Sequence, residues 1–254
     1  MVGVLASHEI FGFKVTPMTT PEILDLIGRN VEKGTTCVLA SQNFHGLYKY
    51  FTDESFRRLH ERARVRIDGM PVVWLARLHG LRVGRQHRVA MIDCFPDLLG
   101  RATREGWRVF YLGGHPEVIR RGLQNLREAY PGLQLDGYHG FFSAAPDSAE
   151  NRSVIDRINA FRPHVLMVGM GMGRQERWIL ENQDRLRVNC AWTCGALLEY
   201  FADAAAVAPR WLGQIGLEWA YRLGSNPRRF AFRYLIEPWL VVGLIVSHRI
   251  RRGA

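Results

Sequence analysis

Short apolar runs alternate with stretches of helical periodicity along most of the chain. The runs are continuous in apolar character, which is typical of strands that are covered on both faces. They lie at Thr36–Ala40, Trp107–Leu112, Leu133–Tyr138, His164–Met170 and Val188–Thr193, with a further short run at Arg64–Ile67. Strands that alternate with helices predict an α/β fold, in which a parallel sheet is flanked by helices.

Glycine and proline mark the ends of several predicted elements. Gly113-Gly114 ends the second long run, and Pro116 stands where it suits the first turn of a helix. A helical pattern also follows Ala40 and extends to about His60. We expect residues 1–195 to form one α/β domain and residues 196–254 to form a helical C-terminal appendage.

Loops at strand ends are the first place to look for a site. In parallel sheets of this kind, ligands bind beyond the carboxyl ends of the strands. The loops at those ends are Ser41-Gln42-Asn43, Asp68-Gly69-Met70-Pro71, Gly113-Gly114, Gly169–Gly173 and Thr193–Gly195.

One of these loops carries three alternating glycines, in V-G-M-G-M-G-R-Q-E from Val168 to Glu176. Glycine lets a backbone approach a ligand closely, and a following helix N-terminus favours phosphate. The spacing is also compatible with nothing more than a tight turn. Gln175 and Glu176 could bind sugar or base hydroxyls, or could cap the helix.

Asp68 has two interpretations as well. An Asp-Gly pair is usually a turn, whereas a carboxylate at the edge of a cleft can act as a general base. No second acid at a short fixed spacing forms a hydrolase pair, and no Asp-x-Asp motif would hold a metal–nucleotide complex. We therefore expect a metal-free mechanism. The scattered histidines His45, His87, His115 and His139 are interpreted as surface or packing residues.

Charge is concentrated near the C-terminus. The chain has a formal net charge of +10 and a pI near 9.9. Arginines and aromatic residues alternate between Gly216 and Leu240, and Glu237 is the single acid after Arg222. Guanidinium groups suit phosphate oxygens, and aromatic rings favour the membrane interface. The segment predicts contact with a phosphorylated lipid at a membrane surface, although a nucleic-acid-binding module or a solvated basic end would have a similar composition.

Composition adds two limits. The chain is 47% hydrophobic and 23% charged, as an ordinary globular protein is. The apolar run Trp239–Val246 falls short of the roughly 20 residues that span a bilayer, and the N-terminus lacks the pattern of a signal peptide.

The cysteines show no disulfide or zinc spacing, so we expect reduced thiols in a cytoplasmic protein. Apolar helix faces suit a homo-oligomer as well as core packing.

The motifs also occur in a recognisable order. They are Asn43, I-D-G-M-P-V-V-W-L-A-R (Ile67–Arg77), L-G-G-H-P (Leu112–Pro116), A-Y-P-G-L (Ala129–Leu133), G-F-F (Gly140–Phe142) and G-M-G-M-G-R-Q-E (Gly169–Glu176). This ordered set, with the tail A-P-R-W, G-L-E-W-A-Y-R-L and N-P-R-R-F, resembles the WecG/TagA/CpsF glycosyltransferases. The resemblance covers roughly Asn43 to Pro238.

The resemblance implies a Rossmann-like, inverting hexosyltransferase, and we expect it to need no metal or other cofactor. Such enzymes move a sugar from a UDP-sugar to a polyprenyl-diphosphate-linked saccharide in bacterial exopolysaccharide or cell-surface polysaccharide synthesis. They act as peripheral proteins on the cytoplasmic face of the membrane.

The same resemblance suggests roles for individual residues. Asp68 falls on the proposed catalytic base of the family. The implied donor-binding residues are Asn43, Arg88, Gly113, Gly114, Gly169, Gly171, Gln175 and Glu176. The implied ligands of the acceptor diphosphate or the UDP leaving group are the appendage arginines Arg222, Arg228, Arg229 and Arg233.

Some positions depart from the family pattern. Gly173-Arg174 replaces a frequent Pro-Lys, Val207-Ala208-Pro209 replaces R-A-P, and Cys194–Glu199 replaces G-G-A-F-D. These departures favour a xanthan-type enzyme that uses UDP-glucose, with a UDP-N-acetylmannosamine or N-acetylmannosaminuronic acid transferase of the same family as the alternative. A nucleic-acid-binding module and a catalytically silent membrane scaffold are the rivals from other classes, and no nucleic-acid partner is expected.

Overall fold

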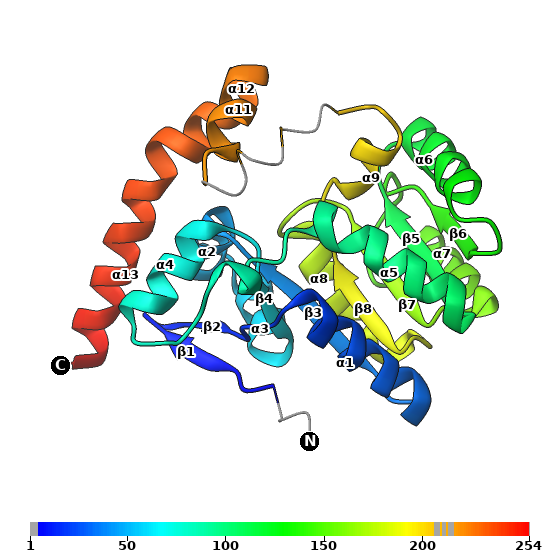
Figure 1. Cartoon of the computed structure of the whole chain (residues 1–254), viewed down its shortest axis with the longest axis horizontal. Helices are drawn as coiled ribbons and strands as arrows, with labels where there is room; N and C mark the ends of the chain where they lie inside the picture. The colour runs from blue at the N-terminus through cyan, green and yellow to red at the C-terminus, as the bar shows by residue number, and fades with distance from the viewer. Residues whose placement is uncertain (1–4, 206–208, 210–211, 213–215, 254) are drawn as a thin grey trace. The chain divides into compact units, whose positions relative to one another are not determined.

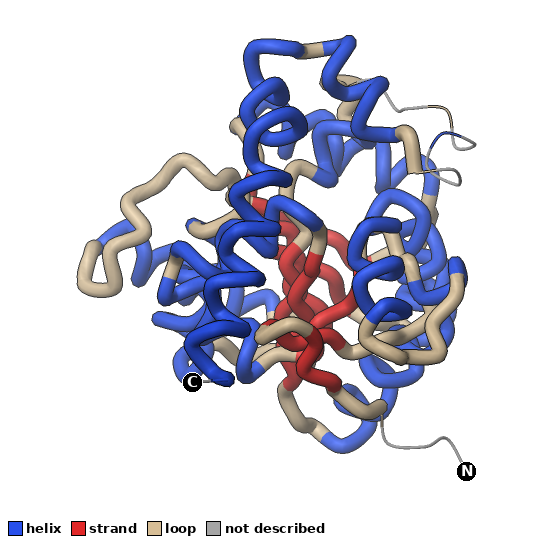
Figure 2. The backbone as a smooth tube through the Cα atoms, turned by 90° about the vertical axis from the view of Figure 1, so that its left-hand side faces the viewer, coloured by secondary structure: helices blue, strands red, loops and turns tan. Residues whose placement is uncertain are grey.

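The computed structural model describes residues 5–205, 209, 212 and 216–253. Its main feature is a six-stranded sheet with the strand order β4-β3-β8-β7-β5-β6. The strands are drawn in red in Figure 2. Their bounds are β3 Cys37–Gln42, β4 Arg64–Ile67, β5 Arg108–Gly113, β6 Gln134–Tyr138, β7 Val165–Gly169 and β8 Cys190–Thr193.

The strands form the parallel sheet that the sequence predicts. β3, β8, β7, β5 and β6 are joined by parallel pairings, so the prediction of a Rossmann-like α/β fold is confirmed. β7 is buried along its whole length, and it has a neighbouring strand on each side. β6 lies at the edge of the sheet, and its residues alternate between less and more buried positions.

Helices connect these strands, as Figure 1 shows. Those before β5 are α1 Thr20–Lys33, α2 Phe44–Thr52, α3 Glu54–Arg62, α4 Met70–Leu78, the short η1 Arg85–His87 and α5 Met91–Glu105. Those after β5 are α6 Pro116–Ala129, α7 Ala149–Phe161, α8 Arg174–Asn182, the short η2 Gln183–Arg185 and α9 Leu197–Phe201. Pro116 begins α6, as predicted.

The chain packs into two compact units. The first unit comprises Met1–Thr19, Ser41–Ala90 and Val207–Ala254, and the second comprises Thr20–Ala40 and Met91–Ala206. The division falls within β3. It does not coincide with the predicted boundary after residue 195, which remains a prediction.

Two local features differ from expectation. The helical pattern up to His60 is divided, because Asp53 ends α2 and its carboxylate accepts a hydrogen bond from Phe56 N in the first turn of α3. An antiparallel hairpin of β1 His8–Ile10 and β2 Phe13–Val15 was not predicted. Its turn residues have positive φ angles, as a tight two-residue hairpin turn requires. Strands of three residues are too short to leave a clear periodicity.

The C-terminal segment is helical, as predicted. It contains α11 Glu218–Ser225, α12 Pro227–Ala231, a π-helical turn η3 Phe232–Ile236 and α13 Glu237–Gly253. α13, drawn in red in Figure 1, packs on α2. Across this contact, the buried Glu237 carboxylate pairs with His45, with 2.7 Å between Oε1 and Nδ1. Within the described ranges, no helix has the length and apolar character needed to cross a membrane.

Candidate active site

Asp68 lies where β4 ends and α4 is about to begin. Its backbone N–H donates to the carbonyl of Gln42 at the end of β3, with 2.8 Å between the two atoms. Gly69 then caps α4 with extended backbone angles. Asp68 is thus fixed at the carboxyl edge of the sheet, where the strand-end rule predicts a site.

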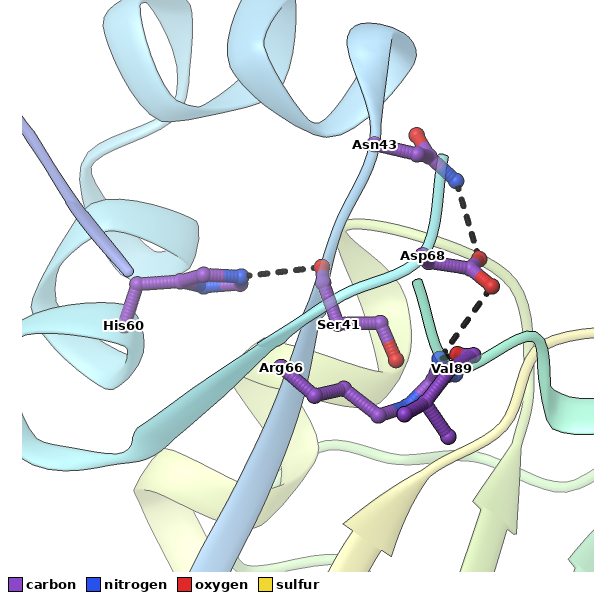
Figure 3. A network of polar contacts seen from close by, with 6 residues as sticks. All are labelled: Ser41, Asn43, His60, Arg66, Asp68 and Val89. Atoms are coloured by element: carbon purple, nitrogen blue, oxygen red, sulfur yellow. Dashed lines mark hydrogen bonds and ion pairs between the residues drawn. The ribbon is translucent and has the colours of Figure 1, made fainter. Parts of the chain in front are cut away.

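Two side chains hold the Asp68 carboxylate, as Figure 3 shows. Arg66 Nη1 donates to Oδ1 at 3.1 Å, and Asn43 Nδ2 donates to Oδ2 at 3.3 Å. Asn43 is also the N-cap of α2, because its Oδ1 accepts from Gly46 N at 2.9 Å. The Asp68 side chain keeps 24% of its surface exposed. The carboxylate is therefore both oriented and accessible, as a general base must be.

Arg66 is a site residue that sequence reasoning missed. Its side chain is 1% exposed, and its guanidinium also donates to the carbonyl of Val89. The sequence does not show that an arginine inside a short strand is buried, because this depends on the face of the sheet from which its side chain projects. The one available signal was its spacing of two residues from Asp68, which places the two on the same face if the strand continues.

The backbone of Arg88 lies beside this network. Residue 88 follows η1 and forms an isolated parallel bridge with Ile67, and the next residue, Val89, donates its N–H to Ile67 O at 2.9 Å. Asn43, Asp68 and Arg88 were all predicted as site residues, and the fold brings them together within the first unit.

Behind the carboxylate network, His60 is fully buried. Its Nδ1 lies 2.9 Å from Phe56 O. Its Nε2 lies 3.3 Å from Ser41 O, the contact drawn at the left of Figure 3. Burial lowers the pKa of His60 from 6.5 to about 4, with a smaller contribution from Lys14, although the two carbonyls oppose this shift. His60 is therefore neutral at physiological pH and supports β3 structurally.

The predicted appendage arginines differ in their surroundings. Burial lowers the pKa of the Arg233 guanidinium below its usual value, and Arg222 adds to this effect, whereas Tyr234, Glu237 and Asp68 oppose it. Arg233 Nε is buried and has no hydrogen-bond partner among the described residues.

Two of the other predicted arginines are at least partly exposed. Arg222 is half-buried in α11 and Arg228 is exposed in α12. The side chain of Arg229 lies outside the part of the chain whose side chains are described.

The second unit has a strand-end region of its own, made largely of backbone. Gly113 at the end of β5 lies so close to Gly169 at the end of β7 that a Cβ on Gly113 would meet the Gly169 carbonyl. A Cβ on Gly169 would in turn meet the Tyr111 hydroxyl and the Gly195 carbonyl. Gly114 and Gly171 have positive φ angles. The glycines predicted to bind the donor are thus required by close packing and turn geometry.

Gln175 and Glu176 use their polar atoms within this region. The Glu176 carboxylate accepts from Gly173 N at 2.6 Å and from Gln175 Nε2 at 2.7 Å. Gln175 Oε1 accepts from Gly195 N at 3.2 Å. Both side chains are 1% exposed. Of the two interpretations of this pair, the capping one is observed, and donor binding remains a prediction.

Each scattered histidine has a structural contact, as expected for a surface or packing residue. His45 pairs with Glu237, His87 accepts from Gly84 N, His115 caps α6, and His139 accepts from Phe141 N. Where the structure describes side chains, no group of three or more His, Cys, Asp or Glu residues is placed to hold a metal ion. The metal-free mechanism remains a prediction.

Comparison with known families places this site in context. Residues 8–254 match the Glycosyl transferase WecG/TagA/CpsF family. The chain belongs to this family, and the resemblance predicted from the motifs is confirmed.

Similar proteins include those of Staphylococcus aureus strains NCTC 8325 / PS 47, COL and MRSA252. All three are named N-acetylglucosaminyldiphosphoundecaprenol N-acetyl-beta-D-mannosaminyltransferase. Each is 31% identical to this chain over 155 residues, which is 61% of this chain and 58% of the relative. The chain thus matches less than two thirds of the length of these curated relatives.

Proposed function

We propose that this protein is an inverting glycosyltransferase that moves a sugar from a UDP-sugar to a polyprenyl-diphosphate-linked saccharide. The observation that carries the proposal is the partly exposed Asp68 carboxylate, which Arg66 and Asn43 hold at the carboxyl edge of the sheet. Family membership supports the same class of reaction.

The relatives favour one donor over the other. Their name describes transfer of an N-acetylmannosaminyl group to N-acetylglucosaminyl-diphospho-undecaprenol. UDP-glucose, the donor favoured by the motif departures, has no support among these relatives. We therefore take UDP-N-acetylmannosamine as the proposed donor and lipid-linked N-acetylglucosamine as the proposed acceptor.

In the proposed reaction, Asp68 removes the proton from the acceptor hydroxyl. The hydroxyl oxygen forms a bond to the anomeric carbon of the donor, and the bond from that carbon to the UDP oxygen breaks, with its electron pair leaving on UDP. Attack from the face opposite UDP inverts the anomeric configuration. Protonated Asp68 then releases its proton to solvent. A positioned general base contributes a rate factor of about 10² to 10⁴.

Arg233 suits the diphosphate in this scheme. Donors aimed at developing negative charge are effective because they need little reorganisation during the reaction. The Nε of Arg233 is buried and has no hydrogen-bond partner among the described residues, so its N–H can donate to a phosphate oxygen. We assign Arg233 and Arg222 to the diphosphate of the leaving group or acceptor. Arg228 is proposed for the lipid side, and Arg229 remains a prediction.

An apolar stripe supports docking at a membrane surface. Exposed apolar residues recur at helical spacing along η3 and α13, and Trp239 is 77% exposed. The stripe comprises Phe232, Leu235, Ile236, Trp239, Val242 and Val246. Such a face can lie in the headgroup region while arginines contact anionic lipid. We propose a peripheral location on the cytoplasmic membrane face; self-association remains a prediction.

The test of activity is UDP release from a panel of UDP-sugars, with and without polyprenyl-diphosphate-linked N-acetylglucosamine. We expect acceptor-dependent release from UDP-N-acetylmannosamine and its loss in Asp68→Asn. Asp25→Asn is the matched control, because Asp25 also pairs with an arginine, Arg101, at 2.7 Å. Unimpaired release by Asp68→Asn would contradict the role of Asp68, and no release by the wild type would contradict the proposed reaction.

Membrane docking has a separate test. We expect co-sedimentation with vesicles that contain phosphatidylglycerol, and its loss when Leu235, Trp239 and Val242 are all replaced by serine. Phe141→Ser is the control, because Phe141 is also an exposed aromatic residue but lies in the second unit. Equal sedimentation of the triple variant and the wild type would contradict docking through this stripe.

A further inference from the structure

We propose that Arg66 is a positioning residue, which sets the orientation of the Asp68 carboxylate for proton transfer. This inference rests on the proposed function, because it concerns the step in which Asp68 acts as a base. It adds a residue that neither the motifs nor the family resemblance identified.

Burial gives Arg66 an unusual dependence on its partners. A guanidinium is always charged in proteins, and a buried charge is strongly unfavourable unless it is paired and hydrogen-bonded. The Arg66 side chain is 1% exposed, and its guanidinium donates to the Asp68 carboxylate and the Val89 carbonyl. The arginine is therefore confined to the geometry that satisfies both of them.

The two partners lie on different segments, so Arg66 connects them. Asp68 directly follows β4, and Val89 follows η1 and the predicted donor-binding residue Arg88. The backbone of Val89 is itself bonded to Ile67. Figure 3 shows the Arg66 side chain reaching Val89, with a dashed line to Asp68. A change at residue 66 should therefore alter the direction of the carboxylate relative to residues 88–89.

Both carboxylate oxygens are engaged, but unequally. Oδ1 accepts from the charged, buried Arg66, whereas Oδ2 accepts a longer hydrogen bond from the neutral amide of Asn43. Hydrogen bonds with a charged donor are the stronger kind. Arg66 therefore contributes most to the orientation, and Oδ2 is the oxygen better placed to take the acceptor proton.

The first test is steady-state kinetics of Arg66→Met, with Arg66→Lys as the conservative variant. We expect kcat to fall by about 100-fold in Arg66→Met, since a misplacement near 1 Å can have that effect. The KM for the UDP-sugar should stay within about threefold. Arg66→Lys should recover part of kcat, because an ammonium retains the charge but not the planar fork.

Arg64→Met is the matched control. Arg64 lies on the same strand, two residues before Arg66, and donates to Leu5 O and Ser7 Oγ instead. We expect kcat of Arg64→Met to stay within about threefold of the wild type. Wild-type kcat in Arg66→Met would overturn the proposal, as would an equal loss in Arg64→Met and Arg66→Met.

A double-variant cycle covers the case in which Arg66→Met folds poorly. If Arg66 acts through Asp68, the variant with both Arg66→Met and Asp68→Asn should be no slower than Asp68→Asn alone. Multiplied losses in kcat would overturn the proposal. An inactive wild type would instead contradict the proposed function. In that case, thermal unfolding of the wild type, Arg66→Met, Asp68→Asn and the double variant would test whether Arg66 and Asp68 are coupled. Additive shifts in Tm would overturn the proposal.

Discussion

The two units end their strands in contrasting ways. In the first unit, the strand ends present a partly exposed carboxylate, held by one buried guanidinium and one amide. In the second unit, the strand ends are glycines in close contact, and the nearby polar side chains Gln175 and Glu176 are buried and bonded to the loops themselves. The same position in a parallel sheet thus provides a chemical group in one unit and a shaped backbone in the other.

The contrast extends to ionisable groups. Tyr111 lies under the glycine loops, donates to Gly195 O at 3.2 Å and accepts from Leu198 N at 3.3 Å. Burial raises its pKa well above the usual value of 10, with Cys194 adding to the effect. Tyr111 is therefore a neutral support, whereas Asp68 keeps a solvent-facing surface. If the contrast holds, substitutions at the strand ends of the first unit should lower activity, and those in the second unit should mainly lower stability.

The largest effect is expected at Asp68. Replacement by asparagine keeps a hydrogen-bond acceptor for Arg66 but removes the base, so kcat should fall by about 10² to 10⁴. The measurement is UDP release at saturating donor and acceptor. Activity within threefold of the wild type would remove Asp68 from the mechanism and weaken the contrast between the units.

The next effect concerns acid stability of the first unit. Folded His60 has a pKa of about 4 against 6.5 unfolded, so between these values the unfolded chain binds more protons. The contribution of His60 to the free energy of unfolding is complete above pH 6.5. It decreases as pH falls toward 4, by about 3 kcal/mol in total.

We expect the free energy of unfolding to fall less steeply between pH 7 and pH 4.5 in His60→Gln than in the wild type. Urea unfolding at several pH values measures this difference. Parallel pH profiles for the two proteins would show that His60 does not carry the effect. His79→Gln serves as a control for a generic loss of a histidine, because His79 is an exposed histidine of the same unit.

A smaller loss is expected at Glu176. Its carboxylate satisfies Gly173 N and Gln175 Nε2, and leaving buried donors unmet costs about 1 to 3 kcal/mol. Glu176→Ala should therefore lower Tm while the KM for the UDP-sugar changes little. A tenfold or larger rise in that KM, with Tm unchanged, would favour the predicted donor-binding role over the capping role.

The smallest effect compares two helix caps. Asn43 caps α2 in the first unit, and Ser148 caps α7 in the second by accepting from Asn151 N at 3.1 Å. Replacing either by alanine should cost about 1 kcal/mol of stability. Only Asn43→Ala should also lower kcat, because Asn43 contacts Asp68. Equal kcat values in the two variants would show that the Asn43 amide has no part in the reaction.

Much of the fold was predictable because its signals are local. The apolar runs located the strands of the sheet to within one or two residues, and Gly113-Gly114 and Pro116 marked the start of α6. The place of Asp68 followed from the strand-end rule together with the family motif. The hairpin at His8–Val15 and the break at Asp53 were missed, since very short strands and a single capping residue leave weak patterns.

The sequence by itself determined the class of fold, the strand-end loops, the family and the identity of Asp68, Asn43 and Arg88 as candidates. Tertiary structure alone decided that Arg66 is buried against Asp68, and that Arg233 Nε is buried without a hydrogen-bond partner among the described residues. The physical reason is that periodicity and turn chemistry act between neighbours along the chain. The burial and pairing of a charge depend on segments far apart in sequence, which meet only when the sheet and the C-terminal helices have packed.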